Sequence, residues 1–282
     1  MGKAIGNEKL HMNKNKTIIL LALSVMMLLA SCNTYTAPEL SLSRDSYIDS
    51  DVFVLYYPYK RKSNAYTLSN PKLKNGFRPV AEHDTWHNER MDNDLRDMIS
   101  ASIDGVFLCI SPIDMADKNK REMIGYFLEK CSQLQFKVVF CLASDTPLSL
   151  RWDNVINYIQ DRHWDTSQSL YEIDGKIPLV FNEAISIAFN GDDTRFTPLS
   201  LDISKGKFAD ALPSPFCVAK SAGAPDTIVA DRSMAAYLID SINEALDLDK
   251  GRILIFSWNF YADGTAIEKN TFDYDTQLKA LQ

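Results

Sequence analysis

Residues 257–268 bring carboxylate, amide and aromatic side chains together directly after an apolar run at 253–256. Such a run is typical of a buried strand, and a polar turn after it is where an α/β barrel carries its chemical groups. Asp263 could give or take a proton here. A second carboxylate flanking the same bond would complete an acid/base pair. We expect Glu268, farther along, to orient the loop rather than to catalyse.

Carboxylates also follow other apolar runs. Asp145 follows the run at 138–142, Glu183 follows 178–181, and Asp202 ends a candidate strand at 199–203. Each could lie at the catalytic face of a barrel, or could cap a helix or sit solvated in a loop. Glu183 is the first choice as partner of Asp263, because its strand is the best defined. We therefore predict Asp263 and Glu183 as catalytic candidates.

Aromatic side chains collect at the same predicted strand ends. Flat rings pack well on the apolar C–H faces of sugars, and packing in the core is the alternative, which we favour for Tyr56. His87 could hold a sugar hydroxyl or could be a histidine of a surface loop. The predicted substrate-binding residues are Tyr57, Tyr59, Trp86, His87, Trp258, Asn259, Tyr261 and Glu268.

Apolar runs alternate with helical stripes along most of the chain. The helical stripes lie near 90–103, 123–134, 152–159 and 234–246, and the strand-like runs are 52–57, 106–110, 138–142, 178–181, 216–219 and 253–256. This alternation indicates parallel strands covered on both sides. A (β/α)8 TIM-type barrel fits it. A flavodoxin-like open sheet is the alternative, although no glycine-rich phosphate loop supports it.

One stretch is short for a complete barrel. Residues 183–213 must supply two strands and the crossover between them. The candidate strands are 185–189 and 199–203, with almost no room for a helix. We expect the barrel to be compressed or incomplete here.

The N-terminus has the features of an export signal. Lys14 and Lys16 precede a thirteen-residue apolar run, 18–30, which is too short to span a membrane as a stable helix. It ends in Leu-Ala-Ser-Cys, which resembles a bacterial lipobox and implies lipidation of Cys32. Cleavage nearby without lipidation, or an uncleaved anchor, is the alternative. We predict a signal peptide at 1–31 with Met12 as the probable true start, a tether at 32–50, and one barrel domain at 51–282.

Charge and cysteine content exclude several functions. The whole chain has a net charge of −7, and residues 32–282 carry 26 basic and 36 acidic side chains, a net of −10. Nucleic-acid binding needs a basic surface, so we expect none, and we expect membrane contact only through the N-terminal lipid. The remaining four cysteines form no Cys-x-x-Cys pair, and we predict buried thiols, no metal and no cofactor.

Several motifs resemble those of glycoside hydrolase family 99. The matching pieces are Leu-Tyr-Tyr-Pro-Tyr at 55–59, Trp-His-Asn at 86–88, Ile-Asp-Gly-Val at 103–106, the run 136–140, the segment 171–178, and Ser-Trp-Asn-Phe-Tyr-Ala-Asp-Gly at 257–264. The resemblance implies a barrel with retaining, endo-acting cleavage of α-mannosides, in which one Glu deprotonates the sugar 2-hydroxyl and another protonates the leaving oxygen. Phe260 and Asp263 stand at those two positions. The third-strand end also departs, with Ala-Ser-Asp at 143–145 where the family has a Glu.

These observations leave two main hypotheses. The first is a lipid-anchored protein of the bacterial cell envelope that binds or cleaves glycan, with an α-mannoside-like substrate implied by the resemblance. The alternative is a barrel that has lost catalysis and retains glycan binding. An envelope protein with no role toward sugars is a third possibility.

Overall fold

The computed structural model describes residues 50–59, 86–144, 146–182, 185–189, 195–202, 206–209, 214–222, 235–248, 250–259, 266–268, 270 and 275–282. The chain divides into units of residues 1–39 and 40–282, and every described residue belongs to the second unit. The predicted signal peptide and most of the tether therefore lie outside the described residues. Among the helices that are described, none is long and apolar enough to cross a membrane.

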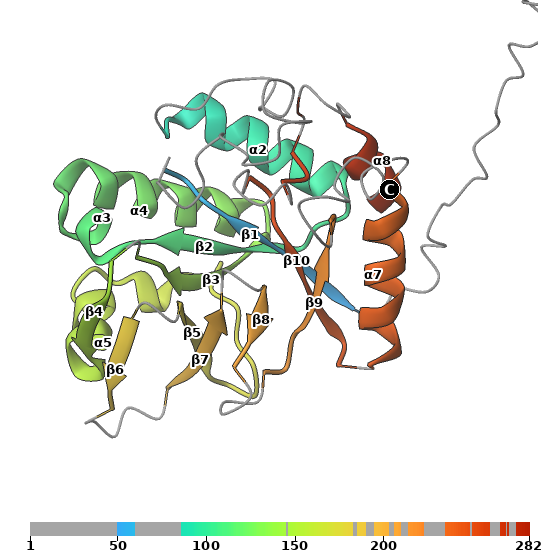
Figure 1. Ribbon diagram of the computed structural model, residues 1–282. Coiled ribbons are helices and arrows are strands. Elements are labelled where there is room, and N and C mark those ends of the chain that lie inside the picture. Colours follow the sequence, from blue (N-terminus) through green and yellow to red (C-terminus); the bar gives the residue numbers. More distant parts are fainter. Residues whose placement is uncertain are drawn as a thin grey trace, which may run out of the picture. The chain divides into compact units, whose positions relative to one another are not determined.

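Eight strands form a single curved sheet, which closes almost completely into a TIM-type barrel (Figure 1). Seven neighbouring strands are parallel, and only β8 runs antiparallel to its neighbour, β7. The order across the sheet is β8-β7-β5-β3-β2-β1-β10-β9. The strands are β1 (Asp51–Tyr56), β2 (Gly105–Ile110), β3 (Lys137–Leu142), β5 (Ile177–Asn182), β7 (Phe196–Asp202), β8 (Lys207–Phe208), β9 (Cys217–Lys220) and β10 (Arg252–Phe256).

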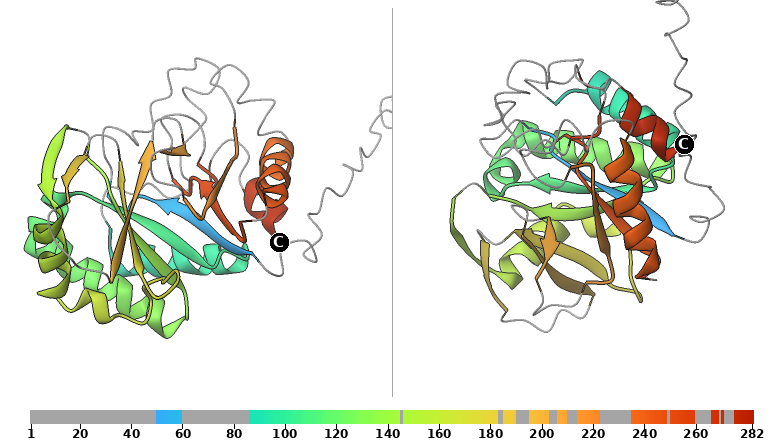
Figure 2. Two further views of the ribbon diagram at one scale, coloured as in Figure 1. Left: turned by 90° about the horizontal axis from the view of Figure 1, so that it is seen from below. Right: turned by 45° about the vertical axis from the view of Figure 1, so that its right-hand side comes forward.

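Helices cover the outer face of this sheet (Figure 2). They are α2 (Asn88–Ser100), α3 (Pro112–Ala116), α4 (Lys118–Gln133), α5 (Trp152–Gln160), α7 (Ala236–Asp247) and α8 (Thr276–Leu281), with a 3-10 turn η2 (Trp164–Thr166). The apolar stripes predicted from the sequence are the faces that they bury, for example Met91, Leu95 and Met98 of α2. The predicted alternation of buried strands and amphipathic helices is confirmed, and the open-sheet alternative is wrong.

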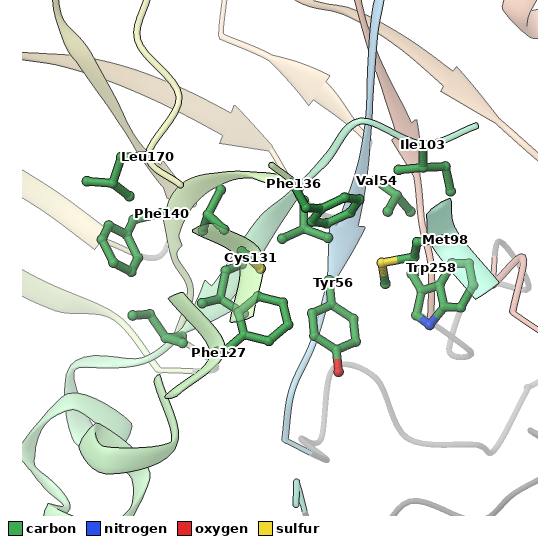
Figure 3. Close-up of a cluster of buried hydrophobic side chains, with 14 of the residues drawn as sticks. Val54, Tyr56, Met98, Ile103, Phe127, Cys131, Phe136, Phe140, Leu170 and Trp258 are labelled. Carbon is green, nitrogen blue, oxygen red and sulfur yellow. The ribbon is translucent and has the colours of Figure 1, made fainter. Parts of the chain in front are cut away.

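The longer strands contribute to two separate cores, because successive side chains of a strand point to opposite faces. Phe53, Leu55 and Tyr57 belong to a cluster that fills the inside of the barrel, which we call the lumen core. Val54 and Tyr56 point the other way, into a larger cluster between the sheet and the helices, which we call the outer core (Figure 3). The described cysteines, Cys109, Cys131, Cys141 and Cys217, are all buried thiols, as predicted.

The stretch between 183 and 213 is compressed, as predicted. β7 includes residues 199–202 of the candidate strand predicted at 199–203, and it joins the barrel. The other candidate is wrong as a barrel strand, because β6 (Ile185–Ala188) pairs instead with β4 (Leu148–Arg151) in a separate two-stranded parallel sheet. The two-residue strand β8 takes the remaining place in the barrel. The sequence did not reveal β4, since it has only four residues and two of them are exposed.

The end of the barrel at which the strands begin is closed by Tyr171. Its ring lies 4.8 Å from that of Phe53, and its hydroxyl donates to Asp51 and accepts from Arg252 Nε at 2.8 Å. Burial and the bond to Asp51 raise the pKa of Tyr171 to about 12, so the phenol stays protonated at neutral pH. The other end, where the parallel strands finish, is the face at which barrels of this type carry their ligand sites.

Candidate functional site

The carboxyl ends of the parallel strands form the mouth of the barrel. Every second side chain of a strand points to the same face, so the lumen-core residues show which positions face inward at the mouth. The described residues at these positions are Tyr57, Ser111, Ala143, Asn182, Leu201, Lys220 and Phe256. Within the described part of the chain, this set holds one cation and no carboxylate. The predicted convergence of the strand ends on one face is confirmed by the parallel register, whereas the inward-facing residue types are not those of an acid/base pair.

A buried carboxylate does follow β2, but its oxygens are already occupied. Asp114 Oδ2 accepts from the backbone N–H of Ser111 at 2.9 Å and from its hydroxyl at 2.7 Å, which forms a capping box at the start of α3. Lys120 Nζ lies 2.7 Å from Asp114 Oδ1. Asp114 therefore stabilises the turn into α3 and is poorly placed to exchange protons with a substrate.

Tyr57 is held in place by the end of β10. Its backbone N–H donates to Asn259 Oδ1 at 2.9 Å, and its carbonyl accepts from Asn259 Nδ2 at 2.7 Å. Arg90 Nη2 also donates to this carbonyl, at 3.4 Å. The ring of Tyr57 is only 1 % exposed, in the lumen core. Asn259, predicted to bind substrate, thus uses its amide to tie β10 to β1.

A buried polar network lies behind Tyr57, in the outer core. The hydroxyl of Tyr56 donates to Asp94 Oδ2 at 2.6 Å and accepts from Trp86 Nε1 at 2.9 Å. Arg90 Nε lies 3.3 Å from the same Asp94 oxygen. Burial first, and then the negative charge of Asp94, raise the pKa of Tyr56 well above its ordinary value, so it remains a donor. This network fixes the start of α2 against β1.

The predicted sugar platform on Trp258 is not supported. Its indole is 1 % exposed and packs in the outer core, where Figure 3 shows it in the same cluster as Met98 and Val54. A stacking platform needs an open ring face. Trp258 lies two residues beyond the end of β10, where the alternation of a strand no longer decides which way a side chain points, so the sequence could not reveal its burial.

Trp86 and His87 also have structural roles. The Trp86 ring is 5 % exposed and lies 5.1 Å from that of Phe127 and 5.5 Å from that of Tyr59. His87 is the exposed N-cap of α2, and its Nδ1 accepts from the backbone N–H of Arg90 at 3.3 Å. The alternatives of core packing and a surface histidine therefore account for both residues.

Among the aromatic residues predicted to bind substrate that the structure describes, Tyr59 is the one that is not fully buried, and it packs against the outer core. It is half-buried, and the ammonium of Lys120 lies 4.6 Å from its centroid. Its hydroxyl donates weakly to the backbone carbonyl of Lys120 at 3.5 Å. Because it follows β1 at the mouth end, Tyr59 remains a candidate for sugar contact.

Glu268 lies in a short segment that folds back over the end of β10. Its backbone N–H donates to the carbonyl of Trp258 at 2.9 Å, and the neighbouring Ile267 N–H donates to the carbonyl of Ser257 at 3.0 Å. Its side chain is 3 % exposed. This placement suits the loop-orienting role that we expected.

Several predicted residues lie outside the described residues. They are the catalytic candidates Asp263 and Glu183, the alternative carboxylate Asp145, Phe260, the aromatic Tyr261, and Cys32. Asp202 is the other alternative carboxylate. It is buried at the end of β7, next to the inward-facing Leu201. Among the described residues, no group of three or more His, Cys, Asp or Glu side chains could hold a metal ion.

The sequence did not draw attention to Arg90, Asp94 or Lys220. Arg90 and Asp94 lie four residues apart inside the buried stripe of α2, and a charged pair at that spacing on an apolar face was an available signal. Lys220 ends the strand at 217–220, with its side chain packed near Phe256. A charged residue directly after a buried strand was the signal there.

Comparison with known proteins supports the fold. No protein-family model matches the chain, and no curated protein matches it significantly. Among solved structures, a GH99 endo-α-mannosidase from Bacteroides thetaiotaomicron in complex with BIS-TRIS-propane has a TM-score of 0.56 at 15 % identity, over 82 % of this chain and 95 % of that one. The fold is GH99-like. A second structure of a GH99 endo-α-mannosidase from this organism has a TM-score of 0.50 at 14 % identity, over 81 % and 95 % of the two chains.

The GH99-like barrel agrees with the resemblance carried by the sequence motifs. At these identities the likeness concerns the fold alone. The chemistry of the site has to be argued from the residues of this chain, and the described mouth differs from a paired-carboxylate site in its residue types.

Proposed function

We propose that this protein binds glycan at the mouth of its GH99-like barrel and that it does not cleave glycan by the acid/base mechanism implied by the family resemblance. The observation that carries the proposal is the composition of the mouth. Its described inward-facing residues carry no carboxylate, and Phe260 stands where the motif resemblance places a family Glu. Phenylalanine cannot titrate, so one half of the pair is missing.

Glycan is the proposed ligand because the solved structures with this fold are named as endo-α-mannosidases. Tyr59 supports this choice, since it offers a partly exposed ring next to the fixed end of β1. An α-mannoside is the first ligand to test. Flat rings bind the apolar faces of sugars without any acid/base pair.

The experiment measures binding and cleavage in parallel. Purified full-length protein is screened on a glycan array and on α-mannan, with product analysis on the same samples. We expect binding without turnover. Tyr59→Ala should weaken binding about five- to tenfold, on the scale of one aromatic contact. Tyr126→Ala is the matched control, because Tyr126 is also half-buried beside a lysine, at 5.5 Å, but lies on α4 away from the mouth.

A divergent glycosidase is the second candidate function. β5 ends at Asn182, and Glu183 is the next residue in the sequence. Asp263 would then be the acid/base and Glu183 its partner. Turnover of α-mannosides that Asp263→Asn abolishes would favour this candidate and would overturn the proposal of a non-catalytic barrel. If the native chain neither binds nor cleaves any glycan, both candidates fail.

The family mechanism can also be tested by restoring its residues. Phe260→Glu combined with Asp263→Glu supplies two carboxylates at the motif positions. Weak α-mannosidase activity in the double variant, with none in the native chain, would support loss of catalysis from a competent ancestor. The single variant Asp263→Glu is the control and should stay inactive.

A further inference from the structure

An apolar pocket lies beside the mouth, on the outer side of the barrel wall between α3, β4 and α5 (Figure 1). Its volume is about 260 Å3, just below the range of about 300–1,000 Å3 that is typical of ligand sites. Its described lining is mostly apolar and includes Pro112, Met115, Leu142, Leu150, Val155 and Tyr158. Leu142 ends β3, and Pro112 follows shortly after the end of β2, so the pocket lies at the mouth end of the wall.

The pocket suits an uncharged apolar group. None of the described residues that line it is charged. Charged residues that adjoin the lining in the sequence already interact within the protein. Asp114 pairs with Lys120 at 2.7 Å, and Arg121 Nη1 donates to the carbonyl of Ala116 at 2.5 Å. A charged ligand would give up its hydration here without a counter-ion, whereas an apolar chain gains free energy by leaving water.

Lys120 connects this pocket to Tyr59, the candidate for sugar contact at the mouth. Its ammonium lies 4.6 Å from the centre of the Tyr59 ring and 2.7 Å from Asp114 Oδ1. The residue after Asp114 is Met115, which lines the pocket. The ring and the pocket are thus separated by one lysine and the short helix α3, which places them within reach of one ligand that carries both a sugar and an apolar chain.

We infer that the pocket holds the apolar aglycone of a glycan, such as the alkyl chain of a glycolipid, while the sugar lies at Tyr59. The inference rests on the proposed glycan binding and adds the class of ligand. A sugar alone would leave the apolar walls formed by Met115, Leu150 and Val155 in contact with water. An alkyl chain covers these walls, and each methylene that leaves water strengthens binding. An apolar side chain of a partner protein offers similar surface but carries no sugar for Tyr59.

The test varies the sugar and the apolar chain separately. Calorimetry on full-length protein measures binding of methyl α-mannoside, hexyl α-mannoside and 1-hexanol. We expect the hexyl mannoside to bind at least about tenfold more tightly than the methyl mannoside, because each additional methylene that leaves water contributes up to about fourfold. Equal binding of the two mannosides would overturn the inference and leave the proposed glycan binding in place. Absence of binding by both mannosides would overturn the proposed function as well. If 1-hexanol binds as tightly as the hexyl mannoside, the sugar contributes nothing and the inference fails.

Ala116→Trp tests where the alkyl chain lies. Ala116 lines the pocket from an exposed position, so a bulky ring there fills the space without disturbing the core. We expect this variant to bind the hexyl mannoside no more tightly than the methyl mannoside. Asn157→Trp is the matched control and should keep the hexyl advantage, because Asn157 is exposed on α5 and does not line the pocket. A hexyl advantage that survives Ala116→Trp would overturn the inference.

Tyr59→Ala tests where the sugar lies. We expect it to weaken both mannosides by the same factor of about five to ten, which leaves the ratio between them unchanged. Loss of the hexyl advantage alone would show that Tyr59 contacts the chain rather than the sugar, and would overturn the arrangement. Light scattering on the native chain tests the other occupant. A dimer that Ala116→Trp dissociates would identify a second copy in the pocket and would overturn the inference.

Discussion

Asn259 is the residue on which the geometry of the mouth depends most directly. Its amide satisfies both backbone groups of Tyr57, with hydrogen bonds of 2.9 and 2.7 Å. It is 5 % exposed, so water cannot easily replace those bonds. Asn259, which the sequence suggested as a ligand contact, therefore shapes the mouth by holding the backbone of Tyr57.

Removal of this amide should loosen the mouth and destabilise the fold. We expect Asn259→Ala to lower the free energy of unfolding by about 1–3 kcal/mol, because it leaves buried backbone groups of Tyr57 without partners. Urea unfolding measures this change. Asn157→Ala, an exposed position on α5, is the matched control and should change stability by less than about 0.5 kcal/mol. Equal effects of the two variants would show that the Asn259 bonds contribute little.

Asp104 makes folding stability depend on pH at the closed end of the barrel. Its Oδ2 accepts from the backbone N–H of Val52 at 2.8 Å. Burial raises the pKa of Asp104, the bond from Val52 opposes this, and the charge of Asp51 adds to the increase. The charged form is therefore disfavoured in the folded state.

Asp104→Asn should stabilise the protein at pH 7, because an amide accepts the same hydrogen bond without the charge. The gain should be below about 1 kcal/mol, since Asp104 is exposed and its charge is screened by solvent. It should disappear as the pH falls through the raised pKa of the folded state and below the ordinary value near 4, where the wild-type carboxyl is protonated in both states. Unfolding curves at pH 7 and pH 3 measure the difference. A gain that persists unchanged at pH 3 would contradict the assignment to this charge.

At the scale of elements, the two edges of the barrel sheet are the short strands β8 and β9. β8 has two residues, and the residue before it, Gly206, has a φ of +56°. A side chain at Gly206 would place its Cβ 2.7 Å from Lys220 Cε and 3.3 Å from Phe256 Cγ. The turn before β8 therefore lies against side chains of β9 and β10.

Alanine substitutions at Gly175 and Gly206 separate the cost of a positive φ from the cost of crowding by neighbouring side chains. Gly175 also has a positive φ, of +72°, but nothing lies within 4 Å of a Cβ placed there. Gly175→Ala should cost about 1–2 kcal/mol from the left-handed backbone alone. Gly206→Ala should cost more, because the side chains of Lys220 and Phe256 must also move. Thermal unfolding of both variants compares them, and a smaller loss for Gly206→Ala would show that the two edges are not in tight contact there.

At the scale of the whole molecule, the same fold is compatible with more than one chemistry. The fold is that of a GH99-like barrel, while the described inward-facing residues at the mouth form no carboxylate pair. Fold alone does not assign function. Binding without cleavage, as proposed, would combine a GH99-like fold with a motif in which Phe260 cannot titrate.

Attachment to the cell envelope is a separate proposal, which rests on the Leu-Ala-Ser-Cys sequence at 29–32. Cys32→Ala should abolish incorporation of labelled fatty acid and leave an unprocessed or soluble product. Metabolic labelling and membrane fractionation measure this. Ser31→Ala keeps a small residue before the cysteine and should still be lipidated. An unchanged mass and unchanged membrane association of Cys32→Ala would contradict the lipoprotein assignment.

Much of the architecture follows from the sequence alone. The apolar runs of β1, β2, β3, β5 and β10 are continuous because parallel barrel strands are buried on both faces, and this pattern is visible without coordinates. The compression between 183 and 213 was also apparent from chain length. The choice of partner for β6 was not, because a four-residue strand carries too little pattern to distinguish a barrel neighbour from β4.

The roles of individual site residues were decided only by the tertiary structure. Trp258 and Trp86 are residues of the type that stacks on sugars, yet both rings are buried. Trp258 packs into the outer core beyond the end of β10, and Trp86 packs against Phe127. Asn259 has the chemistry of a ligand contact, yet its hydrogen-bonding groups are used by Tyr57, which is 202 positions away in the chain. Sequence determines which groups are available. Which of them remain exposed to a ligand depends on contacts between distant segments, and those contacts leave no local pattern.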